Sequence, residues 1–266
     1  MKRYKSTISN ELIRNRQSAD KNSKNILPTT EYRIIITLIS LIKPNAQSFS
    51  KHEIPVTDFC RFWNISYGGT QVKSLSKAIE KLRSEKFIVK NSTVKWLDDN
   101  SCISNGTMNI SLDNSLFELL FNLNGNFTEI DLNNILYLKS KYSINLYLFL
   151  KSLENQTFYN TKLSDAYSKF CDNKYQTKSQ FDKNIIISAI DEINEKTDII
   201  VSRKYKKHFG YPEMLIFKIR SKNEQTQNLK SRKNHILDVC VDDEDKTSSS
   251  STQLNSFNYD ENKLPF

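Results

Sequence analysis

The order of expected helices and strands occurs twice along the chain, and this repeat limits the folds that it can adopt. Each half contains two helices with apolar residues at helical spacing, then a longer third helix, then short β-branched runs typical of strands. The sequence identity between the halves is negligible, so only the architecture repeats. The helices are expected at residues 29–42, 57–63 and 70–86 in the first half and at 140–153, 164–170 and 176–194 in the second. One more apolar helix is expected at residues 114–123, after the strands of the first half.

Several boundaries carry residues that favour helix starts or turns. Thr29 follows Pro28, Thr57-Asp58 starts the second helix, and Ser164-Asp165 starts its counterpart 107 residues after Thr57. We expect these residues to provide the helix caps. The expected strands are 52–56, 87–90, 93–97 and 108–112 in the first half and 157–162, 198–206 and 214–220 in the second, the last two joined by a turn at Gly210-Tyr211-Pro212.

Two helices, a long third helix and a hairpin make up the winged-helix form of the helix-turn-helix motif. We therefore predict an α+β fold of two tandem winged-helix domains, at residues 29–130 and 131–220. In that arrangement the third helix enters the major groove of DNA, and the hairpin lies beside it against the backbone. Residues 1–28 are predicted to be a basic, loosely structured segment, and residues 221–266 a disordered tail.

Positive charge is concentrated on the part of the chain that is expected to fold. The chain has 39 Lys and Arg against 30 Asp and Glu, whereas residues 221–266 have 6 against 8. A basic body favours an anionic partner, first of all nucleic acid, although many basic proteins bind none specifically.

The sequence argues against several other classes of protein. With only 5 glycines and no GxxxxGK[ST] or GxGxxG motif, it offers no phosphate-binding loop, so we expect no nucleotide cofactor. We find no apolar stretch long enough to cross a membrane and no signal peptide, and therefore expect a cytoplasmic protein. The four cysteines form no CxxC pair, and we expect neither a metal site nor a disulfide framework: Cys60, Cys102, Cys171 and Cys240.

The helix over 176–194 has one apolar side and one side that suits base recognition. Glutamine and asparagine can bond adenine, lysine can bond guanine, and an apolar tip can touch a thymine methyl group. The alternative is an ordinary solvated face, although a bare solvent face has little use for an isoleucine. The candidate DNA-binding residues on this helix are Gln176, Thr177, Gln180, Lys183, Asn184 and Ile187.

The strand that follows this helix ends in a run of positive charges. Arg203, Lys204, Lys206 and Lys207 lie within five residues at a predicted hairpin tip, a position from which they can meet phosphates. The alternative is an edge strand protected from aggregation by lysine. Four cations exceed what that protection needs, so we favour phosphate contact.

The long helix of the first half has a weaker candidate surface. Lys73, Ser74, Lys77 and Lys81 share its outer face and could follow a phosphate backbone, but Glu80 among them is typical of an ordinary helix surface.

Catalysis finds little support in the sequence. The 3 histidines, His52, His208 and His235, occupy unrelated places, and no His-apolar-His triplet is present for a metal-dependent nicking enzyme. We therefore predict no catalytic residues and no enzymatic activity.

Several segments resemble the iteron-type plasmid replication initiator (Rep) proteins. In the first half these are the residues around 9–13, 30–44 and 54–60. In the second half, LKSKYSINLY (138–147) is similar to the family signature at the start of the second winged helix. Phe181 and AIDEINEKTD (189–198) are similar to the recognition helix and its exit. The resemblance covers about residues 9–220, with one departure: Asp182-Lys183-Asn184 replaces a run that is usually richer in arginine.

The resemblance implies a fold of two winged helices and a function at a plasmid origin. By analogy, the second domain supplies the main major-groove helix, assigning base reading to Gln180, Lys183 and Asn184, while the first supplies DNA contacts and dimerisation. The implied partners are double-stranded origin repeats (iterons), a second copy of the chain in equilibrium with the monomer, and the host initiator and replicative helicase. Repression of its own promoter is also implied.

Three other readings stay open on sequence alone. One is a winged-helix transcriptional regulator without a role in initiation, another is a nicking enzyme, and the last is a helical scaffold with a basic surface. Only the family resemblance separates an initiator from a regulator, because both bind DNA by the same physics.

Overall fold

The computed structural model describes residues 5–19, 26–42, 46–121, 123, 125–171, 177–208 and 211–222. Residues 1–224 form one compact unit. Beyond residue 222, the predicted disordered tail lies outside the described residues. No helix in the described ranges combines the length and apolar character needed to cross a lipid bilayer.

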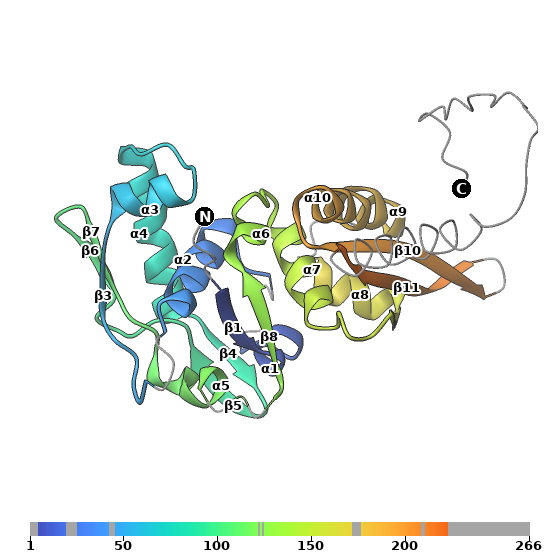
Figure 1. Cartoon of the computed structure of the whole chain (residues 1–266), viewed down its shortest axis with the longest axis horizontal. Coiled ribbons are helices and arrows are strands. Elements are labelled where there is room, and N and C mark those ends of the chain that lie inside the picture. Colours follow the sequence, from blue (N-terminus) through green and yellow to red (C-terminus); the bar gives the residue numbers. More distant parts are fainter. Residues whose placement is uncertain are drawn as a thin grey trace, which may run out of the picture. The chain divides into compact units, whose positions relative to one another are not determined.

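The first half contains the expected helices and a three-stranded sheet whose strand order is β3-β7-β6. The strand that precedes the second helix thus pairs with the last strand of the hairpin, as in a winged helix. The elements are α2 (Thr29–Ser40), β3 (His52–Pro55), α3 (Val56–Phe62), α4 (Gly69–Ser84), β6 (Cys102–Ser104) and β7 (Thr107–Ile110) (Figure 1).

The strands that directly follow α4 are not the wing of this domain. β4 (Lys86–Val89) and β5 (Ser92–Lys95) form a separate hairpin that pairs with β2 (Gln17–Ser18). Their turn residues, Lys90 and Asn91, both have positive φ angles, as a tight hairpin turn requires. In the sequence, this hairpin is therefore inserted between α4 and the strands that form the wing, β6 and β7.

The N-terminal segment is structured, and the expectation of a loose segment over residues 1–28 is wrong for residues 5–19. β1 (Lys5–Ser9) pairs antiparallel with β8 (Phe127–Asp131), and α1 (Asn10–Arg14) follows it. Ile8 and Leu12 are each 4% exposed, and the Thr128 hydroxyl donates to the Asn10 side chain at 2.5 Å. Two well-placed apolar residues and a distant partner strand are enough to order a polar segment.

The second half has the same topology, with the sheet order β10-β11-β9. β10 and β11 form the long hairpin drawn in orange and red beside helices α9 and α10 in Figure 1. The third helix runs without a break from α9 through a π-helical segment into α10. The elements are α7 (Lys141–Lys151), β9 (Phe158–Lys162), α8 (Leu163–Phe170), α9 (Lys178–Phe181), the π-helical segment (Asp182–Ile187), α10 (Ser188–Lys196), β10 (Ile199–His208) and β11 (Tyr211–Ser221).

Short elements differ most from expectation. The helix expected from residue 114 to 123 is a 3-10 turn (Asn114–Leu116) followed by α5 (Phe117–Leu120), and α6 (Leu132–Leu136) and β6 were not predicted. β11 starts at Tyr211, so Tyr211 and Pro212 belong to a strand and not to the turn. Gly210 lies outside the described residues.

The predicted capping residues lie one to three residues beyond the actual N-cap positions of their helices. The N-cap positions of α2, α3 and α8 are Pro28, Pro55 and Lys162, and none of them makes a side-chain capping hydrogen bond. Asp58 and Asp165 lie instead in the first turns, where a carboxylate stabilises the positive end of the helix dipole.

Each half has an apolar core that holds its third helix in place. In the second half the fully buried side chains come from the helices and from both strands of the β10–β11 hairpin, and include Tyr147, Phe170, Phe181 and Phe217. The Phe181 ring meets the Tyr167 ring edge-on at 5.3 Å, which fixes one side of the third helix against α8.

Candidate nucleic-acid interface

The third helix of the second half divides into a buried side and an open side, as predicted. Gln180, Lys183 and Asn184 are exposed on the open side, and Ile187 is half-buried beside them. Gln176 lies outside the described residues. The buried side consists of Phe181, Ile185, Ile186, Ala189, Ile190 and Ile193.

Thr177 has a structural task at the start of this helix. Its hydroxyl accepts a hydrogen bond from the Gln180 backbone N–H at 3.2 Å, which is the bond of an N-capping residue. This bond stabilises the first turn of the helix, so the Thr177 hydroxyl has a structural role that does not depend on a ligand.

The middle of the helix is π-helical, which the regular helical spacing did not predict. Over residues 182–187 the backbone bonds reach one residue further than in an α-helix, and the Ser188 hydroxyl donates to the Lys183 carbonyl at 3.2 Å. Because a π turn holds an extra residue, it presents Lys183, Asn184 and Ile187 on a broader turn. Such segments occur often at functional sites.

The predicted wing cations divide between two sides of β10. Lys204, Lys206 and Lys207 are exposed, and the ladder between β10 and β11 shifts register between Lys206 and Lys207. Arg203 lies on the same side of the strand as the buried Val201, because side chains alternate along a strand. The structure therefore directs three of the four predicted cations to solvent and Arg203 toward the third helix.

Arg203 is held by Asp182 of the third helix. Its guanidinium lies 2.9 Å from Asp182 Oδ2, and the Tyr205 hydroxyl donates to Asp182 Oδ1 at 2.5 Å. Burial, reinforced by this bond to a carboxylate, raises the Tyr205 pKa well above its ordinary value. The sequence showed Asp182 only as a departure from the family pattern. The alternation that sets Arg203 and Tyr205 on one side of a strand was the signal that could have identified its partners.

The outer face of α4 is less uniform than the sequence suggested. Lys73, Ser74 and Lys77 are exposed. Lys81 lies 3.2 Å from the carboxylate of Glu31, which is 4% exposed, and 3.5 Å from that of Glu85. Burial raises the Glu31 pKa despite the nearby lysine. Lys81 thus neutralises a buried acid, which leaves Lys73 and Lys77 as the free end of the predicted stripe.

The wing of the first half, unlike that of the second half, carries no positively charged side chains. Residues 102–110, which form β6, β7 and their turn, contain no Lys or Arg. The turn is formed by Asn105 and Gly106, both with positive φ angles. Of the two wings, only the β10–β11 hairpin is cationic.

The segments that carry the family resemblance meet each other at the base of the third helix. The Glu192 carboxylate accepts hydrogen bonds from the backbone N–H groups of Lys139 at 2.8 Å and Ser140 at 3.4 Å, at the start of α7. Asp198, at the exit of the helix, accepts from the buried Tyr147 hydroxyl at 3.0 Å and from Lys151 at 2.8 Å. These residues attach the helix to α7, so their role is to hold the third helix in place.

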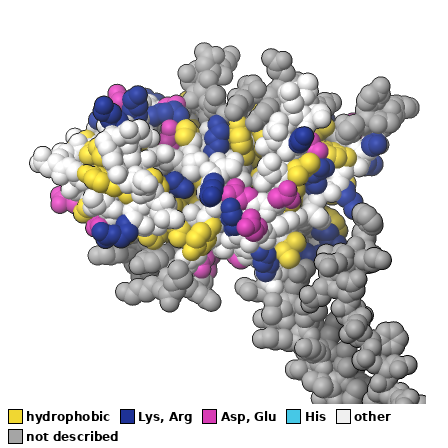
Figure 2. Space-filling model, turned by 90° about the horizontal axis from the view of Figure 1, so that it is seen from above, with side chains coloured by type: hydrophobic (Ala, Val, Ile, Leu, Met, Phe, Trp, Pro, Cys, Tyr) yellow, Lys and Arg dark blue, Asp and Glu magenta, His cyan; other side chains and the backbone are white. Residues whose placement is uncertain are grey.

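Surface charge alone does not mark the interface. On the face shown in Figure 2, lysines and arginines are dispersed among acidic and apolar side chains and do not form one continuous patch. The interface is defined better by the neighbouring third helix and wing of the second half.

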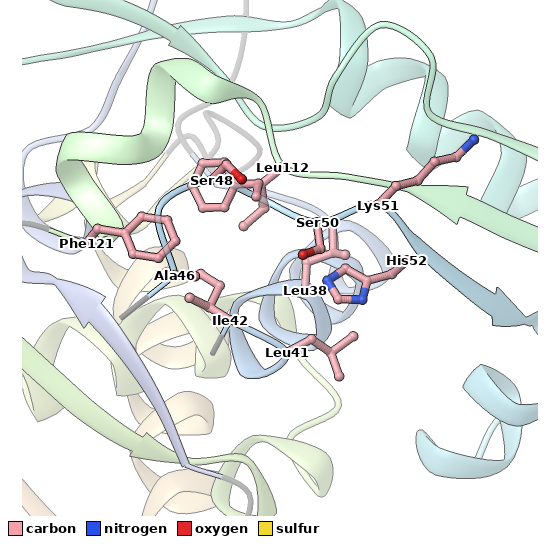
Figure 3. Close-up of a pocket in the computed structure, with 11 residues that line it drawn as sticks. Leu38, Leu41, Ile42, Ala46, Ser48, Ser50, Lys51, His52, Leu112 and Phe121 are labelled. Atoms are coloured by element: carbon pink, nitrogen blue, oxygen red, sulfur yellow. The ribbon is translucent and has the colours of Figure 1, made fainter. Parts of the chain in front are cut away.

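A cavity in the first half contains none of the predicted site residues. It has a volume of about 430 Å³ and is lined mainly by apolar side chains, among them Leu38, Ile42, Leu112 and Phe121. In Figure 3 the Lys51 side chain extends away from the space that the apolar side chains enclose. The cavity offers little chemistry for binding an anion.

Comparisons with known proteins match most of the chain. A family model described as "Initiator Replication protein, WH1" matches residues 6–151, and one described as "Initiator Rep protein, WH2" matches residues 168–219. The predicted fold class of two winged helices and the resemblance seen in the sequence are thereby confirmed.

Two solved structures are also similar. Selenomethionine derivatives of domains 2 and 3 of RctB match at a TM-score of 0.48 and 14% identity, covering 77% of this chain and 85% of that chain. A second structure, of RctB domains 2–3, matches at a TM-score of 0.44 and 14% identity, covering 80% and 88%. No curated protein matches significantly.

Proposed function

Because the chain belongs to the initiator replication protein family and is a DNA-binding replication initiator, we propose that it recognises repeated sites (iterons) in double-stranded DNA at a plasmid origin. The observation that carries this proposal is the pairing of an open polar helix face with a cationic wing in the second half. Gln180, Lys183 and Asn184 would read bases while Lys204 and Lys206 meet the adjacent phosphates.

The side chains on the reading face favour a site rich in A·T pairs. Gln180 and Asn184 suit bidentate bonds to adenine, and the half-buried Ile187 suits contact with a thymine methyl group. Lys183 is the one basic side chain among these candidates and suits guanine. Arginine, the commonest partner of guanine, is missing from residues 176–196.

The first half would contribute a weaker, sequence-independent contact. Lys73 and Lys77 are exposed one turn apart on α4, and Ser74 lies beside them. Lys81 is excluded from this contact because it serves Glu31. The uncharged β6–β7 wing fits a domain that adds phosphate contacts without a second reading site.

The remaining features of the proposal rest on the family and on the expectations drawn from the sequence. The chain would exist as a monomer and a homodimer, repress its own promoter, and recruit the host initiator and helicase. It would act without catalysis, in the cytoplasm. Opening of DNA by the bound protein is the step that separates an initiator from a transcriptional regulator.

The test is a titration of the purified protein against the repeats nearest its own gene, with random duplex as competitor, at two salt concentrations. We expect at least about a thousandfold preference for the repeats. Lys183→Ala should remove much of that preference, whereas Lys162→Ala, an exposed lysine on β9, should leave it unchanged. No preference, together with binding that high salt abolishes, would contradict the proposal.

If the preference is found, the repeats should be tested with the adjacent origin DNA on a supercoiled plasmid, using a reagent for unpaired bases. Opening supports initiation. Tight binding without opening would leave the regulator as the better description, and strand cleavage would contradict the absence of catalysis.

A further inference from the structure

We propose that Asp182 and Arg203 are positioning residues that set the sequence specificity of the second domain without touching DNA. Together with Tyr205 they join the middle of the third helix to the wing, an arrangement that we call the helix–wing bracket. The inference rests on the proposed function, because it assumes that this helix reads bases and that this wing meets phosphates.

The bracket uses both oxygens of a single carboxylate. Arg203 lies 2.9 Å from Oδ2 and the Tyr205 hydroxyl 2.5 Å from Oδ1, and the Arg203 guanidinium lies 5.1 Å from the centre of the Tyr205 ring. The side chains of Asp182 and Arg203 are each 24% exposed. An isolated surface ion pair contributes little, but a half-buried network with fixed geometry contributes more.

Asp182 occupies a position from which it can control the reading face. It is the first residue of the π-helical segment and directly precedes Lys183, and Asn184 follows. A π segment departs from the regular helical bonding pattern, so its orientation depends more on its neighbours. Fixing the Asp182 side chain therefore fixes the direction in which Lys183 and Asn184 leave the helix.

Arg203 and Tyr205 connect this position to the wing lysines. They alternate on β10 with Lys204 and Lys206, so the bracket and the exposed lysines lie on opposite sides of the same strand. A rigid link sets the distance between base contacts and phosphate contacts. When that distance matches the spacing of bases and phosphates in the DNA, base contacts and phosphate contacts form together. Without the bracket, the wing could bind phosphates in several registers relative to the bases.

The bracket assigns Arg203 a different role from that of a phosphate contact. Because Asp182 already balances the charge of Arg203, this arginine should displace no counterions from DNA. Its replacement should therefore leave the salt dependence of binding unchanged. Each true phosphate contact contributes about 0.9 to the slope of log K against log salt. The salt slope therefore separates the two roles.

The experiment compares Asp182→Asn, Arg203→Gln and the double variant with wild type, on repeat and random duplexes over a range of salt. Each single variant should reduce the preference for repeats about tenfold, and the double variant should lose no more than either single variant, because the residues act as one unit. Arg203→Gln should leave the salt slope on random DNA unchanged. Asp191→Asn is the matched control, an exposed acid on α10 with the same change of charge, and should keep the preference.

Amide hydrogen exchange provides a readout that needs no DNA. Asp182→Asn and Arg203→Gln should both accelerate exchange in residues 182–187 and in β10, whereas Asp191→Asn should not. Unchanged exchange in these segments would overturn the bracket. Failure of the wild-type protein to prefer repeats would count against the proposed function and leave the exchange test of the bracket unaffected. A salt slope that falls by about 0.9 in Arg203→Gln, with equal losses on both duplexes, would make Arg203 a phosphate contact and overturn the bracket as well.

Discussion

The three exposed wing lysines should account for a defined part of the salt dependence of DNA binding. We predict that replacing Lys204, Lys206 and Lys207 together by glutamine flattens the slope of log K against log salt by about 2.7, at about 0.9 for each neutralised phosphate. All three side chains are exposed on β10. Arg203 is left in place because Asp182 already balances its charge.

This slope corresponds to a large change in affinity over an accessible range of salt. Raising the salt fourfold, from about 50 to about 200 mM, should reduce the ratio of the wild-type affinity for DNA to the variant affinity about fortyfold. The loss should be the same for repeat and random duplexes, because phosphates carry no sequence information. The ratio of the two affinities should therefore stay constant while both affinities fall.

The measurement is fluorescence anisotropy with a labelled repeat duplex and a labelled random duplex at five or more salt concentrations. The control is a variant with the same loss of charge at Lys51, Lys86 and Lys162, three exposed lysines outside the candidate interface. Its slope should change by less than about 1. Equal flattening in both variants would mean that overall charge matters and the wing does not, and a loss confined to repeats would mean that these lysines read bases.

Three further predictions concern the reading face, a buried acid of the first half and the attachment of the third helix to α7. Lys183→Ala should weaken binding to the repeats by about 1–3 kcal/mol and leave random DNA unaffected, so equal losses in a competition titration would refute the base-reading assignment. Because burial raises the Glu31 pKa above its ordinary 4.5, the folded state binds a proton more readily than the unfolded state, and stability must fall as the pH rises through the folded-state pKa. Urea unfolding of wild type and Glu31→Gln between pH 4 and 8 should show this fall only in wild type, and parallel curves would contradict it. Asp198→Ala should cost about 2 kcal/mol of unfolding free energy, because it leaves the buried Tyr147 hydroxyl without its acceptor and removes one carboxylate from Lys151. Asp198→Asn, which keeps an acceptor oxygen, should recover much of that loss.

The long amphipathic elements were predictable because their own sequences specify them. The helix around Phe181 and Ile190 has apolar residues at helical spacing, so its buried side follows from the sequence alone. The open side with Lys183 followed for the same reason. The strands on either side of Gly210 were also found, since β-branched runs favour them.

Elements that depend on a distant partner were not predictable. β1 is ordered by pairing with residues 127–131, and β6 spans only three residues that β7 holds in place. The roles of Asp182 and Lys81 have the same origin. Lys81 was expected to follow a phosphate backbone, and Asp182 stood out only as a departure from the family pattern, but the fold places Glu31 and Arg203 beside them.

The pairing of β1 with β8 has a consequence for how the chain folds as it is made. β1 leaves the ribosome before β8, yet Lys5 pairs with Asp131, and at a synthesis rate of roughly 5–20 residues per second this partner follows about 6–25 seconds later. Until then the edge of the first strand is open to any other extended segment. The β1–β8 pair can therefore form only when translation has nearly reached the second winged helix. Shortening this wait, in a rearranged chain in which β1 is moved to follow β8, should speed the folding of the first half and reduce aggregation of nascent chains.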